Sequence, residues 1–243
     1  MKLKTLSAAI ALSLASSAAF SGSYIAEVSG AYADFEGDAD AVGLMGEFFF
    51  APVNTDGHPL KEAAFLEQAS SAELFYVSGS ASSVDLTITT LGVNFYIPDT
   101  IFFAGAAVAR TTLEVGSSDD SENDWGLTAG VAPIVGLLVT TEYFDEAGYD
   151  FNLQAKYVKA LKGETAFNVE ASFQDADVDN IYTISGDYFF NKQVSLGANI
   201  VSADETGYGI QGKFFATNEF SIGAEYFTVD DADTIAVEAA YRF

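Results

Sequence analysis

The sequence predicts an all-β protein, an antiparallel, up-and-down β-barrel whose strands cross a membrane. Apolar and polar residues alternate along most of the chain, as in Tyr208, Ile210 and Phe214 against Gln211 and Lys213. This period of two is the pattern of strands with one apolar face. Many of the segments span about ten residues, the length that a tilted strand needs to cross a bilayer. Alternation alone also fits a soluble β-sandwich, so the placement of charge decides between the two classes.

Taken in order, the alternation predicts fourteen strands, at residues 24–34, 41–50, 71–79, 85–96, 101–115, 125–134, 137–144, 149–160, 165–174, 181–190, 193–202, 207–216, 219–229 and 234–243. An even number of strands leaves both termini of the chain on one side of the membrane. Setting aside residues 1–21 and a 20-residue insertion leaves 202 residues. Divided among fourteen strands, this is 14.4 residues for each strand together with its connection. The same division gives 16.8 for twelve strands and 12.6 for sixteen. Fourteen is therefore preferred, with twelve or sixteen as the alternatives.

The fourth predicted strand changes phase along its length. The apolar residues Leu86 and Ile88 have even numbers, whereas Leu91 and Phe95 have odd numbers, so the two pairs would lie on opposite faces of a regular strand. An extra residue in a strand produces such a shift, so we expect a β-bulge at residues 89–90.

The predicted strand ends carry an internal repeat. A glycine followed by closely spaced aromatic residues recurs at residues 46–50, 92–96, 186–190 and 212–215. Aromatic residues gathered at one edge of alternate strands are typical of the interfacial girdle of a membrane barrel.

The charged residues avoid the face that would meet lipid. Twenty acids and no base fall in the connections at one rim, at residues 34–40, 78–85, 116–124, 145–150, 174–180, 202–207 and 229–233. Thirteen charges within strands fall on the parity assigned to the lumen and are expected to line a pore: Glu27, Glu47, Glu73, Arg110, Glu114, Glu142, Lys156, Glu170, Asp187, Lys213, Glu225, Glu238 and Arg242. A charge facing the bilayer midplane costs roughly 2 to 4 kcal/mol, so this distribution favours the membrane barrel over the sandwich.

Residues 1–21 are expected to be a cleaved signal peptide. Lys2 and Lys4 precede an apolar run at residues 6–20, and Ala19 and Ser21 supply small side chains at the cleavage-specifying positions. Residues 17–19 offer a competing cleavage site. A helical N-terminal anchor is the alternative, although the run is shorter than the ~20 residues of a membrane span. A single barrel domain would then occupy residues 22–243.

An insertion at residues 51–70 is the one helical candidate. Pro59 suits a first helical position, and residues 61–68 are good helix formers. The insertion leaves from the periplasmic rim, where it could fold into the lumen or lie beneath the rim. We expect the second placement, because constrictions usually come from the longer outer loops. His58, the only His, is expected to be a polar turn residue.

The composition excludes several functional classes. The absence of Cys excludes a disulfide scaffold, a thiol enzyme and a Cys-ligated zinc site. Ten basic against 35 acidic residues, a net charge of −25, excludes a protein that neutralises nucleic-acid phosphates. Acidic disordered chains are poor in aromatics, whereas this chain has 21 Phe and 12 Tyr that need an apolar environment.

No motif points to catalysis, a cofactor or a dedicated metal site. The sequence lacks a nucleophile elbow, a metal-binding His cluster and a phosphate loop, so no enzyme is expected. Asp175, Asp177 and Asp179 imitate the start of a calcium loop. Asn180 and Gly186 occupy the positions where that loop needs Gly and Glu, however, so no calcium site is expected there.

The C-terminal Ala-Tyr-Arg-Phe243 resembles the end of Gram-negative outer-membrane barrels, whose terminal aromatic belongs to the signal read by the barrel-assembly machinery. The resemblance implies this role for Tyr241 and Phe243. Residues 51–56 and 59–66 are similar to the segment after the second strand in the general bacterial porins of marine and related proteobacteria. This resemblance implies an outer-membrane porin.

The expected function is passive diffusion of ions and small hydrophilic solutes through an outer-membrane pore. Nine acids against four bases in the expected lining, and the acidic outer mouth, predict a preference for cations. The alternative is a non-conducting structural or adhesive barrel, in which inward acids and bases pair into a plug. The acidic outer loops are expected to share divalent cations with the phosphates of surrounding lipopolysaccharide.

Overall fold

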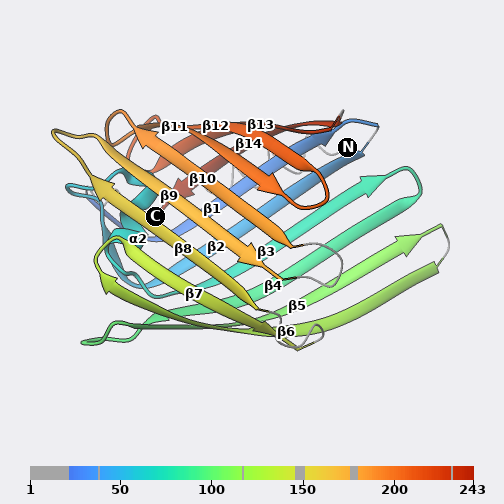
Figure 1. Cartoon of the computed structure of the whole chain (residues 1–243), viewed down its shortest axis with the longest axis horizontal. Coiled ribbons are helices and arrows are strands. Elements are labelled where there is room, and N and C mark those ends of the chain that lie inside the picture. The colour runs from blue at the N-terminus through green and yellow to red at the C-terminus, as the bar shows by residue number, and fades with distance from the viewer. Residues whose placement is uncertain (1–21, 38, 117, 146–150, 176–179, 231) are drawn as a thin grey trace.

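The computed structural model describes residues 22–37, 39–116, 118–145, 151–175, 180–230 and 232–243. In them the chain forms a closed barrel of fourteen antiparallel strands, in which each strand pairs with its neighbours in sequence and the last pairs with the first (Figure 1). The predicted fold class and strand number are confirmed. The expected signal peptide and most of the calcium-like motif lie outside the described residues.

The strands are β1 (Ser23–Phe35), β2 (Ala39–Asn54), β3 (Ser71–Ala81), β4 (Val84–Tyr96), β5 (Phe102–Val115), β6 (Ser118–Ile134), β7 (Leu137–Phe144), β8 (Asn152–Ala160), β9 (Ala166–Gln174), β10 (Ile181–Phe189), β11 (Val194–Ser202), β12 (Thr206–Phe215), β13 (Phe220–Val229) and β14 (Ala232–Arg242). A 3-10 turn, η1 (Leu60–Glu62), leads into the short helix α2 (Ala63–Leu66), and both lie in the predicted insertion. No helix in the described part of the chain has the length and apolar character needed to cross a membrane.

The register assigns each strand residue to the inner or the outer face, because directly opposed residues share a face and successive residues alternate. Leu91 lies opposite Leu74 and Val108, and all three side chains are more than half exposed. They belong to the apolar outer band. Their neighbours Gly92 and Glu73, which also lie opposite each other, face the lumen.

The expected bulge at residues 89–90 is absent, so this prediction is wrong. β4 pairs without a register shift with both β3 and β5. Leu86 and Ile88 therefore face inward, whereas Thr87 and Thr89 face outward. The phase change marks the level at which the strand passes beyond the apolar band, where the outer face meets water and becomes polar.

The long hairpin of β5 and β6 is a second departure from prediction. Residues 116–124 were expected to form a loop, but β6 begins at Ser118 and pairs with β5 up to Val115. Polar residues on consecutive positions do not interrupt the strand, because beyond the membrane both faces of a hairpin can meet water. The hairpin consequently projects past β8 to β10 at the outer rim (Figure 1).

Candidate functional site

Eleven of the thirteen charged residues expected to line the pore lie on the inner face. They are Glu27, Glu47, Glu73, Glu142, Lys156, Glu170, Asp187, Lys213, Glu225, Glu238 and Arg242. They come from every strand except β4 to β6 and β11, so these inward charges surround the lumen on most sides.

Arg110 and Glu114 face outward, and the prediction that they line the pore is corrected for these two. Arg110 lies opposite Thr89 and Asn123, and it shares its parity with Val108, which is 55% exposed on the outer band. The charge pattern misled the prediction here, because beyond the apolar band the outer face meets water and can carry charge.

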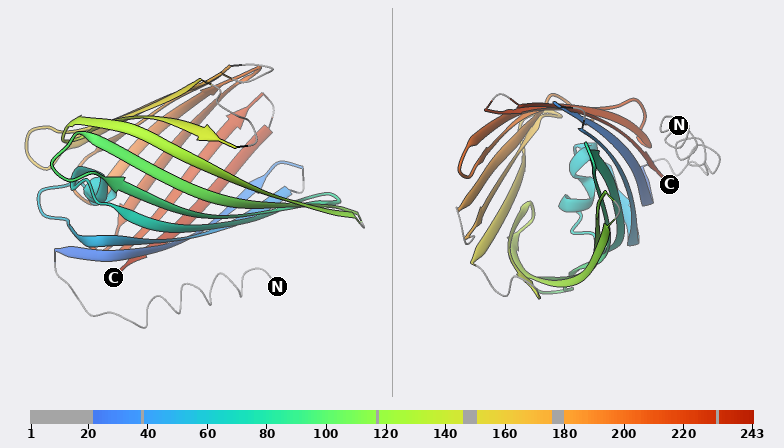
Figure 2. Two further views of the ribbon diagram at one scale, coloured as in Figure 1. Left: turned by 90° about the horizontal axis from the view of Figure 1, so that it is seen from below. Right: turned by 90° about the vertical axis from the view of Figure 1, so that its right-hand side faces the viewer.

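The insertion enters the lumen at the end where β1 begins and β14 ends, which the sequence analysis expects to be the periplasmic end, and α2 lies there within the ring of strands (Figure 2). The Leu60 N–H donates to the Lys192 carbonyl at 2.8 Å, and the Leu60 carbonyl accepts from Arg242 Nη1 at 2.9 Å. The prediction that this segment lies beneath the rim is wrong. The insertion occupies part of the lumen and narrows it.

An apolar cluster inside the barrel explains this placement. Tyr24, Phe49, Val53 and Ala63 pack together and are almost fully buried, and Tyr24 meets Phe49 edge to face at 5.4 Å between ring centroids. Inward aromatic rings at this level would otherwise face a wet lumen. Covering them with the insertion removes apolar surface from water, which favours the inserted arrangement.

Ion pairs fix the insertion to the wall. Lys61 Nζ lies 2.7 Å from Asp187 Oδ2, and Glu62 Oε2 lies 2.9 Å from Lys156 Nζ. Asn168 Nδ2 also donates to Glu62 Oε1 at 2.8 Å. Both carboxylates are buried, with side-chain exposures of 2% for Asp187 and 1% for Glu62. Because an unpaired buried charge is strongly destabilising, these contacts hold the insertion in one position.

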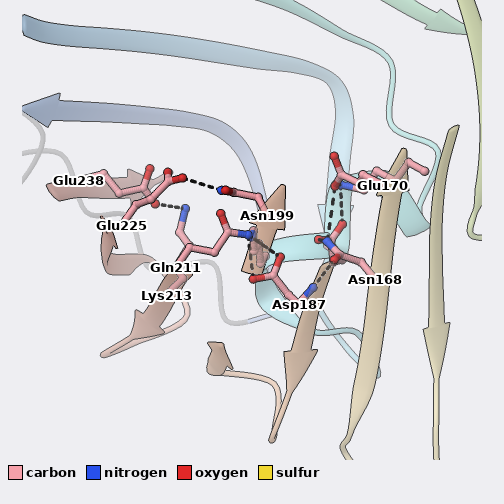
Figure 3. Close-up of polar contacts among 11 residues, drawn as sticks. Asn168, Glu170, Asp187, Asn199, Gln211, Lys213, Glu225 and Glu238 are labelled. Atoms are coloured by element: carbon pink, nitrogen blue, oxygen red, sulfur yellow. Dashed lines mark hydrogen bonds and ion pairs between the residues drawn. The ribbon is translucent and has the colours of Figure 1, made fainter. Parts of the chain in front are cut away.

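The polar contacts continue along the inner face of β9 to β14 (Figure 3). Gln211 donates to both oxygens of Asp187 at 3.2 Å. Lys213 pairs with Glu238 at 2.8 Å, and Asn199 donates to Glu225 at 2.6 Å. A cavity of about 320 Å³ lies between this network and Lys61. Polar side chains thus line this wall of the lumen from β9 to β14.

Cations and carboxylates of the lumen differ in how they are paired. The eleven inward charges named above are eight acids and three bases, which gives a formal charge of −5. Lys61 and Glu62 of the insertion add one charge of each sign and leave this sum unchanged among the described residues. The four cations are all in ion pairs: Lys61, Lys156, Lys213 and Arg242. Four carboxylates have no cation within 4 Å in the described part of the chain: Glu47, Glu73, Glu142 and Glu225.

The sequence interpretation missed the part that Lys61, Glu62 and Asn168 play in the lumen. A signal for them was present in the aromatic repeat, because Phe49, Phe189 and Phe215 of that repeat lie on the inward parity. These three side chains are 2%, 1% and 2% exposed. Buried rings at one end of a polar lumen require an apolar cover, and the insertion is the nearest segment that can supply it.

This fold and lining define a class of protein, the channel-forming barrels of the outer membrane. Residues 1–153 match the family described as "Putative general bacterial porin", and the chain belongs to this family. Family and fold are those of a channel rather than an enzyme.

Two solved structures with related folds illustrate the relationship. The chain is similar to the Acinetobacter baumannii outer membrane protein Omp33, with a TM-score of 0.76 and 23% identity over 91% of this chain and 99% of that chain. It is also similar to the CymD monoaromatic hydrocarbon channel, with a TM-score of 0.58 and 10% identity over 91% and 88% of the two chains. At these identities the likeness establishes the fold alone. No curated protein sequence matches the chain.

Proposed function

We propose that this porin passes ions and small hydrophilic solutes by diffusion and prefers cations. The observation that carries this proposal is the difference in pairing within the lumen. All four inward cations are neutralised by ion pairs, whereas Glu47, Glu73, Glu142 and Glu225 have no cationic partner among the described residues. Their charge must be balanced by cations from solution.

The arrangement of the unpaired carboxylates supports selection by charge. Glu47 and Glu73 lie opposite each other on β2 and β3, next to Glu27. Glu142 and Glu225 lie on other parts of the wall, on β7 and β13. Charged side chains distributed around a pore set ion selectivity through the local potential. A solute cation therefore meets an attractive potential from several sides of the lumen, and an anion meets repulsion.

The test is the reversal potential of the refolded mature chain in a planar bilayer under a KCl gradient. The proposal predicts a cation-selective potential. Changing Glu47, Glu73, Glu142 and Glu225 together to Gln should reduce the cation-to-anion permeability ratio by about twofold or more, since the fixed charge is removed from the pore itself. An anion-selective potential in the unaltered protein would refute the proposal.

A matched control changes the same number of acids on the outer face. Asp34, Asp85, Glu114 and Asp119 lie on outward parity near the outer rim. Converting these four to the corresponding amides alters the net charge equally but leaves the lumen intact. Equal loss of selectivity in the two variants would show that overall charge, and not the lumen, is responsible.

The second candidate function is a non-conducting structural barrel, and the inserted segment is the observation that favours it. The ion pairs of Lys61 and Glu62 and the buried cluster around Ala63 close part of the periplasmic end. Absence of conductance from correctly folded protein in repeated bilayer recordings would establish this candidate in place of the pore.

A further inference from the structure

The inner face of β3, β4 and β5 is largely apolar where these strands approach the outer rim. Phe75, Val77, Leu86, Ile88 and Leu113 lie on inward parity in the outer parts of β3, β4 and β5, and we call them the apolar mouth wall. Val77 lies opposite Ile88, and Leu86 lies opposite Leu113. All five side chains retain contact with solvent, and Phe75 and Leu113 are 39% and 42% exposed.

The outer face of the same strands is polar, so lipid does not account for this wall. Thr87 and Thr89 alternate with Leu86 and Ile88 along β4 and face outward, as does Arg110 on β5. Along this part of β4 the usual arrangement of a membrane barrel is inverted, with polar residues outside and apolar residues inside. The apolar mouth wall thus faces the entrance of the lumen and not the bilayer.

Carboxylates on β6 adjoin the apolar mouth wall on the same inward face. Across the three adjacent strands β4, β5 and β6, Ile88 lies opposite Thr111, and Thr111 lies opposite Glu122. In the next row, Leu86 is followed by Leu113 and then by Asp120. Each row therefore joins an apolar surface to a negative charge, and both carboxylates are exposed.

From this juxtaposition we propose that the outer mouth binds small organic ammonium ions that carry an apolar body. The apolar body would cover the apolar mouth wall, and the ammonium group would lie against Asp120 or Glu122. Water released from both apolar surfaces and the complementary charge favour such a ligand. A simple metal ion lacks the apolar body, and an organic anion would be repelled. The inference deepens the proposed cation-preferring pore and rests on it for the onward passage of the bound ion.

The binding test uses the refolded mature barrel in lipid nanodiscs, with equilibrium dialysis against phenethylammonium and subtraction of binding to empty nanodiscs. Ethylammonium, which lacks the ring, and 2-phenylethanol, which lacks the charge, are the comparison probes. We expect phenethylammonium to bind about tenfold more tightly than either, because both surface burial and charge attraction contribute. Equal binding of phenethylammonium and 2-phenylethanol would overturn the proposal.

Two variants and one control locate the site. Ile88→Thr reduces the apolar mouth wall while keeping a β-branched side chain, and Asp120→Asn with Glu122→Gln removes the charges. Each should weaken phenethylammonium binding several-fold. Glu114→Gln with Asp119→Asn makes the same charge change on the outer face of the same hairpin, and it should leave binding unchanged. If the control weakens binding as much as the inner pair does, the inward site is refuted.

Other occupants of the apolar mouth wall produce different results. A second copy of this chain would give a dimer in light scattering that Ile88→Thr dissociates, and this would overturn the small-ligand proposal. Cation-selective conductance without phenethylammonium binding would overturn the mouth site alone. Binding without conductance would instead overturn the proposed pore and leave the binding site standing.

Discussion

At the scale of single residues, the side on which a side chain lies decides its effect. Ile210 and Gln211 are neighbours in the middle of β12, but Ile210 is 61% exposed on the outer band and Gln211 bonds with Asp187 inside. The register leaves no intermediate position, since successive strand residues point to opposite faces.

We expect Ile210→Arg to prevent or strongly slow refolding, whereas Gln211→Arg folds. A charge facing lipid near the midplane costs roughly 2 to 4 kcal/mol, and the lumen accepts charge without that cost. Heat-modifiable mobility on gels after refolding into lipid vesicles measures the folded fraction. Similar folded fractions for the two variants would show that the register of β12 is incorrect.

Arg242 connects the insertion to the closing strands. Its guanidinium pairs with Glu27, donates to the Leu60 carbonyl, and stacks on the rings of Tyr24 and Phe215, at 4.4 and 4.7 Å from their centroids. From sequence alone, this residue would be one inward charge among many. The structure makes it the point at which the last strand holds the lumen segment.

Arg242→Ala should therefore destabilise the barrel. Removing one partner of a buried ion pair typically costs roughly 3 kcal/mol or more, and Glu27 would lose its cation. Urea-induced unfolding from lipid vesicles, followed by the fluorescence of the single Trp, gives the change in free energy. A loss below about 0.5 kcal/mol, the size of an exposed pair, would contradict a structural role for Arg242.

At the scale of elements, the insertion and the C-terminal strand have separate tasks. The insertion occupies the lumen, whereas β14 closes the barrel against β1. The Phe243 N–H donates to the Ala26 carbonyl at 2.9 Å, and the Ile25 N–H donates to the Phe243 carbonyl at 2.7 Å. The two tasks predict different consequences of removal.

Replacing residues 56–68 with a short Gly-Ser turn should widen the pore. The segment contributes Lys61 and Glu62 to the lumen and fills its periplasmic end, so single-channel conductance should rise by about twofold or more, since current follows the narrowest cross-section. The alteration of Lys61 and Glu62 to Met and Gln, which retains the segment, serves as the control. An unchanged conductance after removal of the segment would show that the constriction lies elsewhere.

Loss of the terminal aromatic should impair assembly in cells. Phe243→Ala keeps the backbone pairing to β1 but removes the ring that packs against Tyr241, with 5.0 Å between the two ring centroids. We expect less folded protein in outer membranes than for Phe243→Tyr, because the aromatic ring is the feature proposed to be read by the assembly machinery. If both variants refold equally in vitro but differ in cells, the ring acts through that machinery. Equal amounts in cells would exclude this role.

At the scale of the whole molecule, charge is distributed between a lumen and a mouth that respond differently to salt. The Debye length is about 10 Å at 0.1 M salt and about 3 Å at 1 M. Charges at the exposed rim lose influence over the pore axis as salt rises, whereas carboxylates within the lumen remain close to any passing ion. The chain as a whole has a net charge of −25.

Cation preference should consequently decrease with ionic strength but persist at 1 M KCl. Reversal potentials measured at a fixed concentration ratio, from about 0.05 M to 1 M, test this expectation through screening. Complete loss of preference at 1 M would assign selectivity to the outer rim and not to Glu47, Glu73, Glu142 and Glu225.

The sequence by itself determined the strands, their number and most of the inward residues. Alternation is a local property, and the cost of placing charge against lipid forces that pattern on every strand within the band. The fourteen strands and eleven of the thirteen expected inward charges follow from these two constraints. The rule fails at Arg110 and Glu114, because beyond the band lipid no longer selects the outer face.

Only the tertiary structure decided the contents of the lumen. Lys61 meets Asp187, and Glu62 meets Lys156 and Asn168, across long separations in the chain. No local pattern specifies such contacts, because they depend on which walls the closed barrel brings together. The placement of the insertion and the ion pairs of Lys61, Glu62 and Arg242 arise from that closure.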